Sequence, residues 1–246
     1  MNAKENMVVA PVITPEWLNK KQRMFAELDK QLNANIISGT GISLDDLQLI
    51  LERKCPEMVL EKWAQFFKDI FSIESTLSDI IIPPAHKGFG WTAVCLQQIP
   101  LNELWRSYAD QKIGHFSIYG DDLEAVVSHN DRNNSSNNNN STILMRNCWE
   151  ADEELKNFSA NQLREQCIVG CTLYERLDIG LFQWWLTGGK NGGRHLDAKT
   201  ITLCSGSRYD DGRVPGVSWY SDEVNVHWYH PLSAHDSLRA RQVKTV

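Results

Sequence analysis

The chain has 246 residues, of which 42% are hydrophobic and 23% charged, enough for one large globular domain or for a core with a smaller appendage. Its formal net charge of −6 argues against a general affinity for nucleic acid or for an anionic membrane surface, because both favour a basic protein surface. No run approaches 18 apolar residues and the N-terminus lacks a secretory pattern, so we expect a soluble, cytoplasmic protein with no membrane partner.

The first 78 residues are predicted to form a helical segment. A helix should begin at Pro15, which follows a threonine N-cap, and run to about Asn33, because apolar residues recur there at spacings of three, four and seven. A second helix is expected from Ser43 and a third over residues 58–71.

Residues 79–246 are predicted to form an α+β domain. Strands are expected over residues 91–97 and 115–119, with a short helix over residues 101–110 between them, which is typical of a parallel strand–helix–strand unit. The asparagine- and serine-rich run at residues 132–141 cannot bury a core and is interpreted as a mobile surface loop.

Helix-start signals and alternating strands follow this loop. Capping boxes at Ser159 and Thr172 each predict a helix, and the second helix is amphipathic from Leu173 to Trp185. Beyond it, alternating apolar residues predict a hairpin across Tyr220-Ser221-Asp222. The expected fold class is therefore α+β, with a helical N-terminal segment and then a mixed sheet whose β-rich C-terminal part packs on the amphipathic helix.

The second half of the chain also contains a set of recognisable short runs. These are NDR, EADEEL, HLD, TLCSGSR, DGRVPGVSW, VHWYHP and LRAR, within residues 115–246. As a set, they resemble a widespread family of short, uncharacterised bacterial proteins. The resemblance implies a bacterial protein and no particular activity. Members of that family run almost directly from NDR into the next strand, so the asparagine run at residues 133–140 is interpreted as a local insertion.

The run "CSGSR" first suggests a thiolate nucleophile beside an arginine. A phosphatase-type loop needs five residues between cysteine and arginine, whereas three separate Cys204 from Arg208. The six cysteines show no disulfide framework spacing, and we interpret them as reduced core residues, Cys204 included.

His195 and Asp197 are the candidate catalytic residues. If the segment is extended, their side chains project to one face and the carboxylate could orient the imidazole as a general base. The alternative is that the histidine merely follows a glycine-rich helix end and the aspartate caps the next turn.

The candidate ligand-binding residues form an anion clamp. Backbone N–H groups in the glycine turn after Cys204 could make an anion-binding nest beside an arginine, and two C-terminal arginines could join it or instead pair with acidic residues. This set is Ser205, Ser207, Arg208, Arg239 and Arg241.

No metal or cofactor is expected. His227 and His230 project to opposite faces of a predicted strand, so they do not make a tetrahedral site. The acidic run at residues 150–154 is interpreted as a solvated first helical turn.

Two main functional hypotheses follow. The first is a binding or interaction module without catalytic activity, for a small anionic ligand or a protein partner. The alternative is an enzyme acting on a phosphorylated or other anionic small molecule, with His195 and Asp197 as base and orienter and the arginines as clamp. Nucleic-acid binding through a local basic patch is a third class, which the overall charge opposes.

Overall fold

The computed structural model describes residues 22–23, 25–27, 29–30, 56–75, 77–132 and 140–245. The chain divides into two compact units, residues 1–55 and 56–246. In the first unit the described residues are helical, and the remainder of the two helices predicted there lies outside the described residues. Within the part of the chain that is described, no helix combines the length and apolar character needed to cross a membrane.

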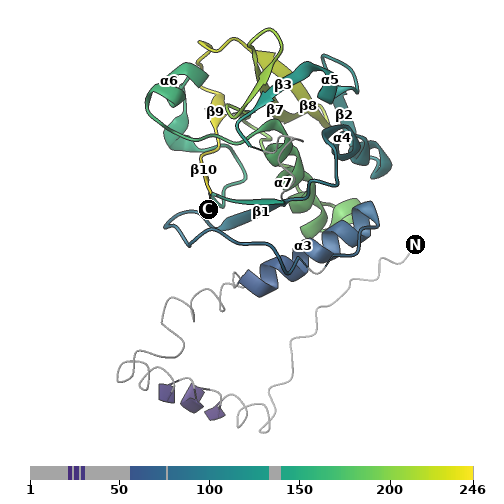
Figure 1. Cartoon of the computed structure of the whole chain (residues 1–246), viewed down its shortest axis with the longest axis vertical. Helices are drawn as coiled ribbons and strands as arrows, with labels where there is room; N and C mark the ends of the chain where they lie inside the picture. Colours follow the sequence, from purple (N-terminus) through teal and green to yellow (C-terminus); the bar gives the residue numbers. More distant parts are fainter. Residues whose placement is uncertain are drawn as a thin grey trace, which may run out of the picture. The chain divides into compact units, whose positions relative to one another are not determined.

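The second unit is an α+β fold (Figure 1). Its helices are α3 (Pro56–Phe71), α4 (Leu101–Asp110), α5 (Leu123–Val126), α6 (Ala160–Glu165) and α7 (Leu173–Leu186), with 3-10 turns η1 (Glu153–Leu155) and η2 (Gly189–Asn191). Its strands are β1 (Trp91–Cys95), β2 (Gly114–Ser117), β3 (Val127–Asn130), β4 (Ser141–Met145), β5 (Ile201–Leu203), β6 (Ser207–Tyr209), β7 (Val214–Tyr220), β8 (Glu223–Tyr229), β9 (Leu238–Ala240) and β10 (Val243–Lys244).

Helix α7 runs through the interior of this unit, as Figure 1 shows in green. It contacts α3, α4, β1 and β7, and every residue from Leu173 to Trp184 is buried. Thr172 begins the helix with the predicted capping box, in which its hydroxyl accepts from the Glu175 N–H while the Glu175 carboxylate accepts from the Thr172 N–H. A helix buried on all sides holds the surrounding strands in place.

Helix α3 belongs to the second unit and not to the N-terminal segment to which the sequence pattern assigned it. Trp63 stacks on Phe182 of α7 with ring centroids 3.8 Å apart, and its indole N–H donates to the Thr92 carbonyl. The domain boundary therefore lies before α3 and not near residue 78, because α3 shares its core with α7.

The described strands form a five-stranded mixed sheet in the order β2-β8-β7-β5-β9, a three-stranded sheet β1-β4-β10 and the ribbon β3-β6. The predicted hairpin is confirmed: β7 and β8 pair antiparallel, and Ser221 and Asp222 turn the chain with φ of 53° and 61°. The predicted strand–helix–strand unit is wrong. Strand β1 pairs antiparallel with β4, whereas β2 pairs with β8 of another sheet, so α4 connects two sheets.

Candidate functional site

The ribbon β3–β6 brings polar side chains that are far apart in the chain to one place. His129 of β3 is the register partner of Arg208 of β6, and the Asp131 N–H extends the ladder by donating to the Gly206 carbonyl at 2.8 Å. Side chains alternate between the two faces of a strand, so the histidine, the arginine opposite it and the aspartate two residues later share one face.

The other face of the ribbon points into the core. Ser207 is fully buried; its hydroxyl donates to the Asn130 side-chain carbonyl and accepts the Leu173 N–H at 2.9 Å. These bonds tie the ribbon to the first turn of α7. Ser207 was predicted to bind a ligand, and the structure places it in the core because its position in the strand alternates with that of Arg208.

The predicted N–H nest in the glycine turn does not form. The N–H of Ser205 donates to the Leu203 carbonyl, that of Gly206 to Cys171 and that of Ser207 to Cys204, each at 2.9–3.0 Å. Gly206 is required for close packing: a Cβ there would lie 2.9 Å from the Gly170 carbonyl oxygen. The turn therefore contributes side chains, and not backbone donors, to any ligand.

A pocket of about 330 Å³ lies between the face of the ribbon that carries His129, Asp131 and Arg208 and the segment formed by α6 and the loop after it. Its volume is at the lower end of the range typical for small-molecule sites. The lining combines charged, polar and apolar residues: His129, Asp131, Ala160, Leu163, Arg164, Cys167, Ile168, Val169, Gly170, Ser205 and Arg208. We call it the ribbon pocket.

The wall of the ribbon pocket at Gly170 is fixed by a buried ion pair. Arg132 donates through Nε and Nη2 to the two carboxylate oxygens of Glu175, at 2.8 and 2.9 Å, and Nη2 also donates to the Gly170 carbonyl at 2.6 Å. Glu175 is fully buried. A bidentate pair of this kind holds planar groups in one geometry, so the pocket is preformed on this side.

Arg208 is the best-positioned cation in the pocket. Its Nη1 donates to the Ser205 and Ser207 carbonyls, both at 2.7 Å, whereas Nε and Nη2 make no hydrogen bond to any described residue. Partial burial lowers the pKa of Arg208; the Asp131 carboxylate opposes this shift and the Arg164 guanidinium adds to it. The guanidinium is therefore held rigidly, with its remaining donors available, and a second cation is close to it.

His129 and Asp131 form a hydrogen-bonded pair on the pocket wall. His129 Nε2 lies 3.1 Å from Asp131 Oδ1, and the two side chains are 60% and 49% exposed, which leaves both accessible to a ligand. An ionised carboxylate only accepts hydrogen bonds, so Nε2 carries the proton and Nδ1 has no bonding partner among the described residues.

The predicted pair His195 and Asp197 is not hydrogen-bonded together. The fully buried Asp197 accepts from Arg176 Nε and Arg241 Nη2, each at 2.7 Å, and from the Thr202 hydroxyl at 2.5 Å. Burial alone would raise the pKa of Asp197, but Arg241 and Arg176 hold it below its usual value. The carboxylate neutralises two core arginines, so orienting His195 is not its role.

His195 instead packs against aromatic rings. Its imidazole lies parallel to the Trp219 indole, with ring centroids 3.5 Å apart. The ring centroid of Trp184 lies 6.4 Å from that of the imidazole. Burial first, and then the charge of Arg176, lower the pKa of His195 to about 4. At neutral pH it is an uncharged packing residue with no hydrogen bond among the described residues.

The two C-terminal arginines of the predicted clamp also lie elsewhere. Arg241 is buried, and besides Asp197 it donates to the Cys148 and Trp149 carbonyls at 2.8 and 2.9 Å. Arg239 pairs with Glu153. The structure thus brings only Ser205 and Arg208 of the predicted ligand set into the ribbon pocket.

The acidic run at residues 150–154 is only in part the solvated turn that its composition suggests. Glu153 and Glu154 are exposed in the first turn of η1, as expected, whereas Asp152 is buried. Asp152 is 1% exposed, and burial raises its pKa to about 6. Glu150 accepts from the Lys199 N–H and the Thr200 hydroxyl, and Glu154 pairs with Arg146. Glu150 thus joins the loop before α6 to the segment before β5, Glu154 joins it to the residue after β4, and Asp152 joins it to the C-terminal segment by accepting from the Gln242 N–H at 2.7 Å. Among the described residues, no group of three or more His, Cys, Asp or Glu side chains is arranged to hold a metal ion.

The cysteines divide into two groups. Cys204 is buried with Cys95 and Cys171, and burial, followed by the proximity of Cys171, raises the pKa of the Cys204 thiol well above its usual value. This agrees with its interpretation as a core residue. Cys148 and Cys167 are exposed, contrary to expectation, and Cys167 lines the ribbon pocket.

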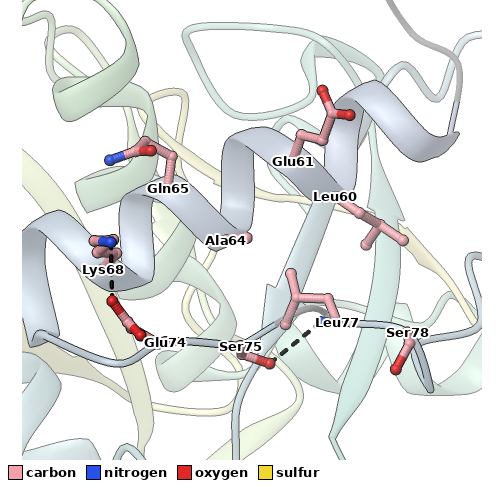
Figure 2. Close-up of a pocket in the computed structure, with 9 residues that line it drawn as sticks. All are labelled: Leu60, Glu61, Ala64, Gln65, Lys68, Glu74, Ser75, Leu77 and Ser78. Atoms are coloured by element: carbon pink, nitrogen blue, oxygen red, sulfur yellow. Dashed lines mark hydrogen bonds and ion pairs between the residues drawn. The ribbon is translucent and has the colours of Figure 1, made fainter.

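A larger, open hollow of about 820 Å³ lies along α3 (Figure 2). Its one cation, Lys68, is bonded to Glu74 at 2.9 Å, and the rest of the lining that Figure 2 shows is apolar or uncharged apart from Glu61. Among the residues that line it, no cation is left available for an anionic ligand, so this hollow offers less for such a ligand than the ribbon pocket.

The site predicted from the sequence does not include Arg164, His129 or Asp131. Helix α5 ends at Val126 and β3, with four residues, begins immediately after it, so the strand alternation that places the histidine and the aspartate on one face is too short to be recognised in the sequence. Comparison with family models, curated proteins and solved structures finds no match to this chain. The bacterial-family resemblance therefore stays a prediction.

Proposed function

We propose that the second unit is a binding module for a small anionic ligand and that the ribbon pocket is its site. One observation carries the proposal: Arg208 is fixed by two backbone carbonyls and keeps Nε and Nη2 available in a preformed pocket beside Arg164. An immobilised guanidinium with open donors suits a phosphate or carboxylate, which accepts two parallel hydrogen bonds.

The ligand is a small molecule and not an extended polyanion. The pocket volume of about 330 Å³ holds a head group with a short substituent, and the chain carries a net charge of −6, which repels long polyanions. The proposed setting is the cytoplasm of a bacterium. The family resemblance supports this setting, and free thiols such as Cys171 and Cys204 in the core fit a reducing compartment.

An enzyme acting on the same class of ligand is the second candidate. The observation that favours it is the His129–Asp131 pair on the pocket wall, since a carboxylate-held imidazole is a common general base. Among the described residues, no hydroxyl or thiol is hydrogen-bonded to that imidazole, so binding is the better-supported function.

Calorimetric titration of the full chain with inorganic phosphate at pH 7 tests the proposal. Removing one charged donor weakens anion binding by about 1.5–3 kcal/mol, so Arg208→Gln and Arg164→Gln should each raise the dissociation constant about tenfold or more. Arg106→Gln is the matched control, because Arg106 is an exposed arginine of α4 away from the pocket. Undiminished binding in Arg208→Gln would refute the proposal.

A further inference from the structure

The charges that face the ribbon pocket do not balance a dianion when His129 is neutral. Arg164 and Arg208 supply two positive charges, and Asp131 supplies one negative charge. The pocket wall therefore carries a net charge of +1, which matches a monoanion. A protonated imidazole would bring the total to +2 and match a dianion, and in a partly desolvated pocket such a match decides which ligand binds.

The hydrogen bond to Asp131 determines how His129 can meet an anion. Because Nε2–H donates to Asp131 Oδ1 at 3.1 Å, the other ring nitrogen of the neutral side chain presents a lone pair. A lone pair repels the oxygen atoms of a bound anion. Protonation of Nδ1 converts this acceptor into a donor, and the Asp131 carboxylate stabilises the resulting imidazolium.

We infer that the ribbon pocket selects a tetrahedral dianion, of the kind that heads a phosphomonoester, and that its binding takes up one proton at His129 Nδ1. The proton comes from the solvent, the new N–H donates to an oxygen atom of the anion, and the proton returns to the solvent when the anion leaves. This inference rests on the proposed function, since it names the ligand class and the pH dependence of the same site.

The neighbours of His129 are consistent with this exchange. Asp131 adjoins it on β3, and Arg208 is its register partner on β6. The α6 side contributes Arg164 and the Cys167 thiol, and Ser205 contributes an uncharged hydroxyl. A dianion bound beside His129 attracts the positive charge of an imidazolium, so uptake of the proton is linked to binding.

Inorganic sulfate is the suitable probe, because its charge of −2 does not change between pH 6 and pH 8. Calorimetric titration of the full chain should give a sulfate dissociation constant about tenfold higher at pH 8 than at pH 6, since one linked proton changes affinity up to about tenfold per pH unit. Titrations near neutral pH in two buffers with different heats of ionisation should show net proton uptake. The monoanion nitrate should bind about tenfold more weakly than sulfate at pH 6.

Three variants separate the contributions. His129→Gln should bind sulfate with the wild-type affinity of pH 8 at both pH values and take up no proton. Cys167→Ser should keep the wild-type pH dependence, because the thiol is not the proton acceptor. Arg208→Gln should bind sulfate poorly at every pH.

The outcomes distinguish this inference from the function on which it rests. Sulfate binding that depends on Arg208 but is equal at pH 6 and pH 8 would overturn the proton uptake and leave the anion site intact. Nitrate binding as tight as sulfate binding would overturn the preference for a dianion. No sulfate binding at pH 6 would overturn both the inference and the proposed function.

Discussion

The Asp197 cluster, formed with Arg176, Arg241 and Thr202, contains the same kinds of charged residue as the ribbon pocket. In the cluster these groups are buried and paired, whereas in the pocket they are accessible. In the cluster, Asp197 is fully buried and both of its oxygens are engaged by Arg176, Arg241 and Thr202. In the ribbon pocket, Arg208 keeps two of its nitrogens available, and the side chains of His129 and Asp131 are about half exposed.

The difference shows that availability, and not residue type, distinguishes a candidate binding site from a structural ion pair. Buried charges must be neutralised by partners, and once neutralised they have no donors left for a ligand. A charge at a pocket wall is partly hydrated, and exchanges that water for a ligand. Sequence motifs such as "HLD" report the residue types and not their partners.

Replacing the Asp197 carboxylate should reduce the free energy of unfolding more than changes at Asp178, at His195 or in the ribbon pocket. Asp197→Asn leaves Arg176 and Arg241 buried beside a neutral amide, and loss of one partner of a buried pair costs about 3–5 kcal/mol. Asparagine tolerates the left-handed φ of 59° at this position, so the backbone is not the cause of the loss. Urea unfolding at pH 7 measures the change, and a loss below about 1 kcal/mol would contradict the account.

Helix α7, which supplies Arg176 to the Asp197 cluster, also contains a buried acid with no cation beside it in the described part of the chain, and this acid tests the converse case. Asp178 of α7 is fully buried and its Oδ1 has no partner among the described residues. Burial, followed by the charge of Glu175, raises its pKa well above the usual value. The folded state then binds more protons than the unfolded state above about pH 4, so this acid lowers stability as pH rises.

Asp178→Asn should therefore stabilise the protein by about 2 kcal/mol at pH 8 and by much less at pH 4, because asparagine removes the cost of keeping this acid protonated. Urea unfolding at the two pH values measures the difference. The matched control is Asp110→Asn at the exposed end of α4, which should change stability little at either pH. A destabilised Asp178→Asn variant at pH 8 would show that this carboxylate has a cationic partner.

His195 has a smaller effect on stability, with a pH dependence opposite to that of Asp178. Its pKa of about 4 lies below the usual 6.5, so the unfolded state binds more protons in this range and stability falls as pH decreases from about 6.5 to 4. His195→Phe keeps the stack on Trp219 without this titration, and should reduce the acid-induced loss by about 1 kcal/mol after allowance for solvent screening. Thermal or urea unfolding of the wild type and of His195→Phe at pH 4.5 and pH 7 measures the difference. The same loss of stability in both proteins between these pH values would contradict the role of His195.

The ribbon pocket should respond least in stability. Asp131→Asn and Arg164→Gln alter exposed groups of the pocket, so each should change the free energy of unfolding by no more than about 0.5 kcal/mol at pH 7. Urea unfolding beside Asp197→Asn measures the contrast directly. A loss of several kcal/mol in either pocket variant would show that the residue stabilises the fold and is not simply available to a ligand.

Local sequence signals predicted local structure well. The capping boxes at Ser159 and Thr172 form as expected, and so does the tight turn between β7 and β8. Each of these signals involves residues within a few positions of one another, so the chain can satisfy them wherever the element lies in the fold.

The sequence predicted contacts between distant segments less well than it predicted local structure. The strands β1 and β2 were recognised but assigned to one sheet, because alternation reports a half-buried strand and not its neighbour. Arg208 was identified as a candidate, whereas Arg164 was missed because no motif connects two arginines 44 positions apart. His195 and Asp197 share a motif but face different partners, aromatic rings in one case and two arginines in the other.

The sequence by itself therefore determined the α+β class, the helix starts of α6 and α7 and the C-terminal hairpin, because hydrophobic period, caps and turn residues act over short distances. Only the tertiary structure decided which charges are neutralised and which are available. That decision depends on burial and on pairing between segments such as β3 and β6, which are about 80 residues apart in the chain. The same chemistry is structural at Asp197 and open to a ligand at Arg208 for this reason.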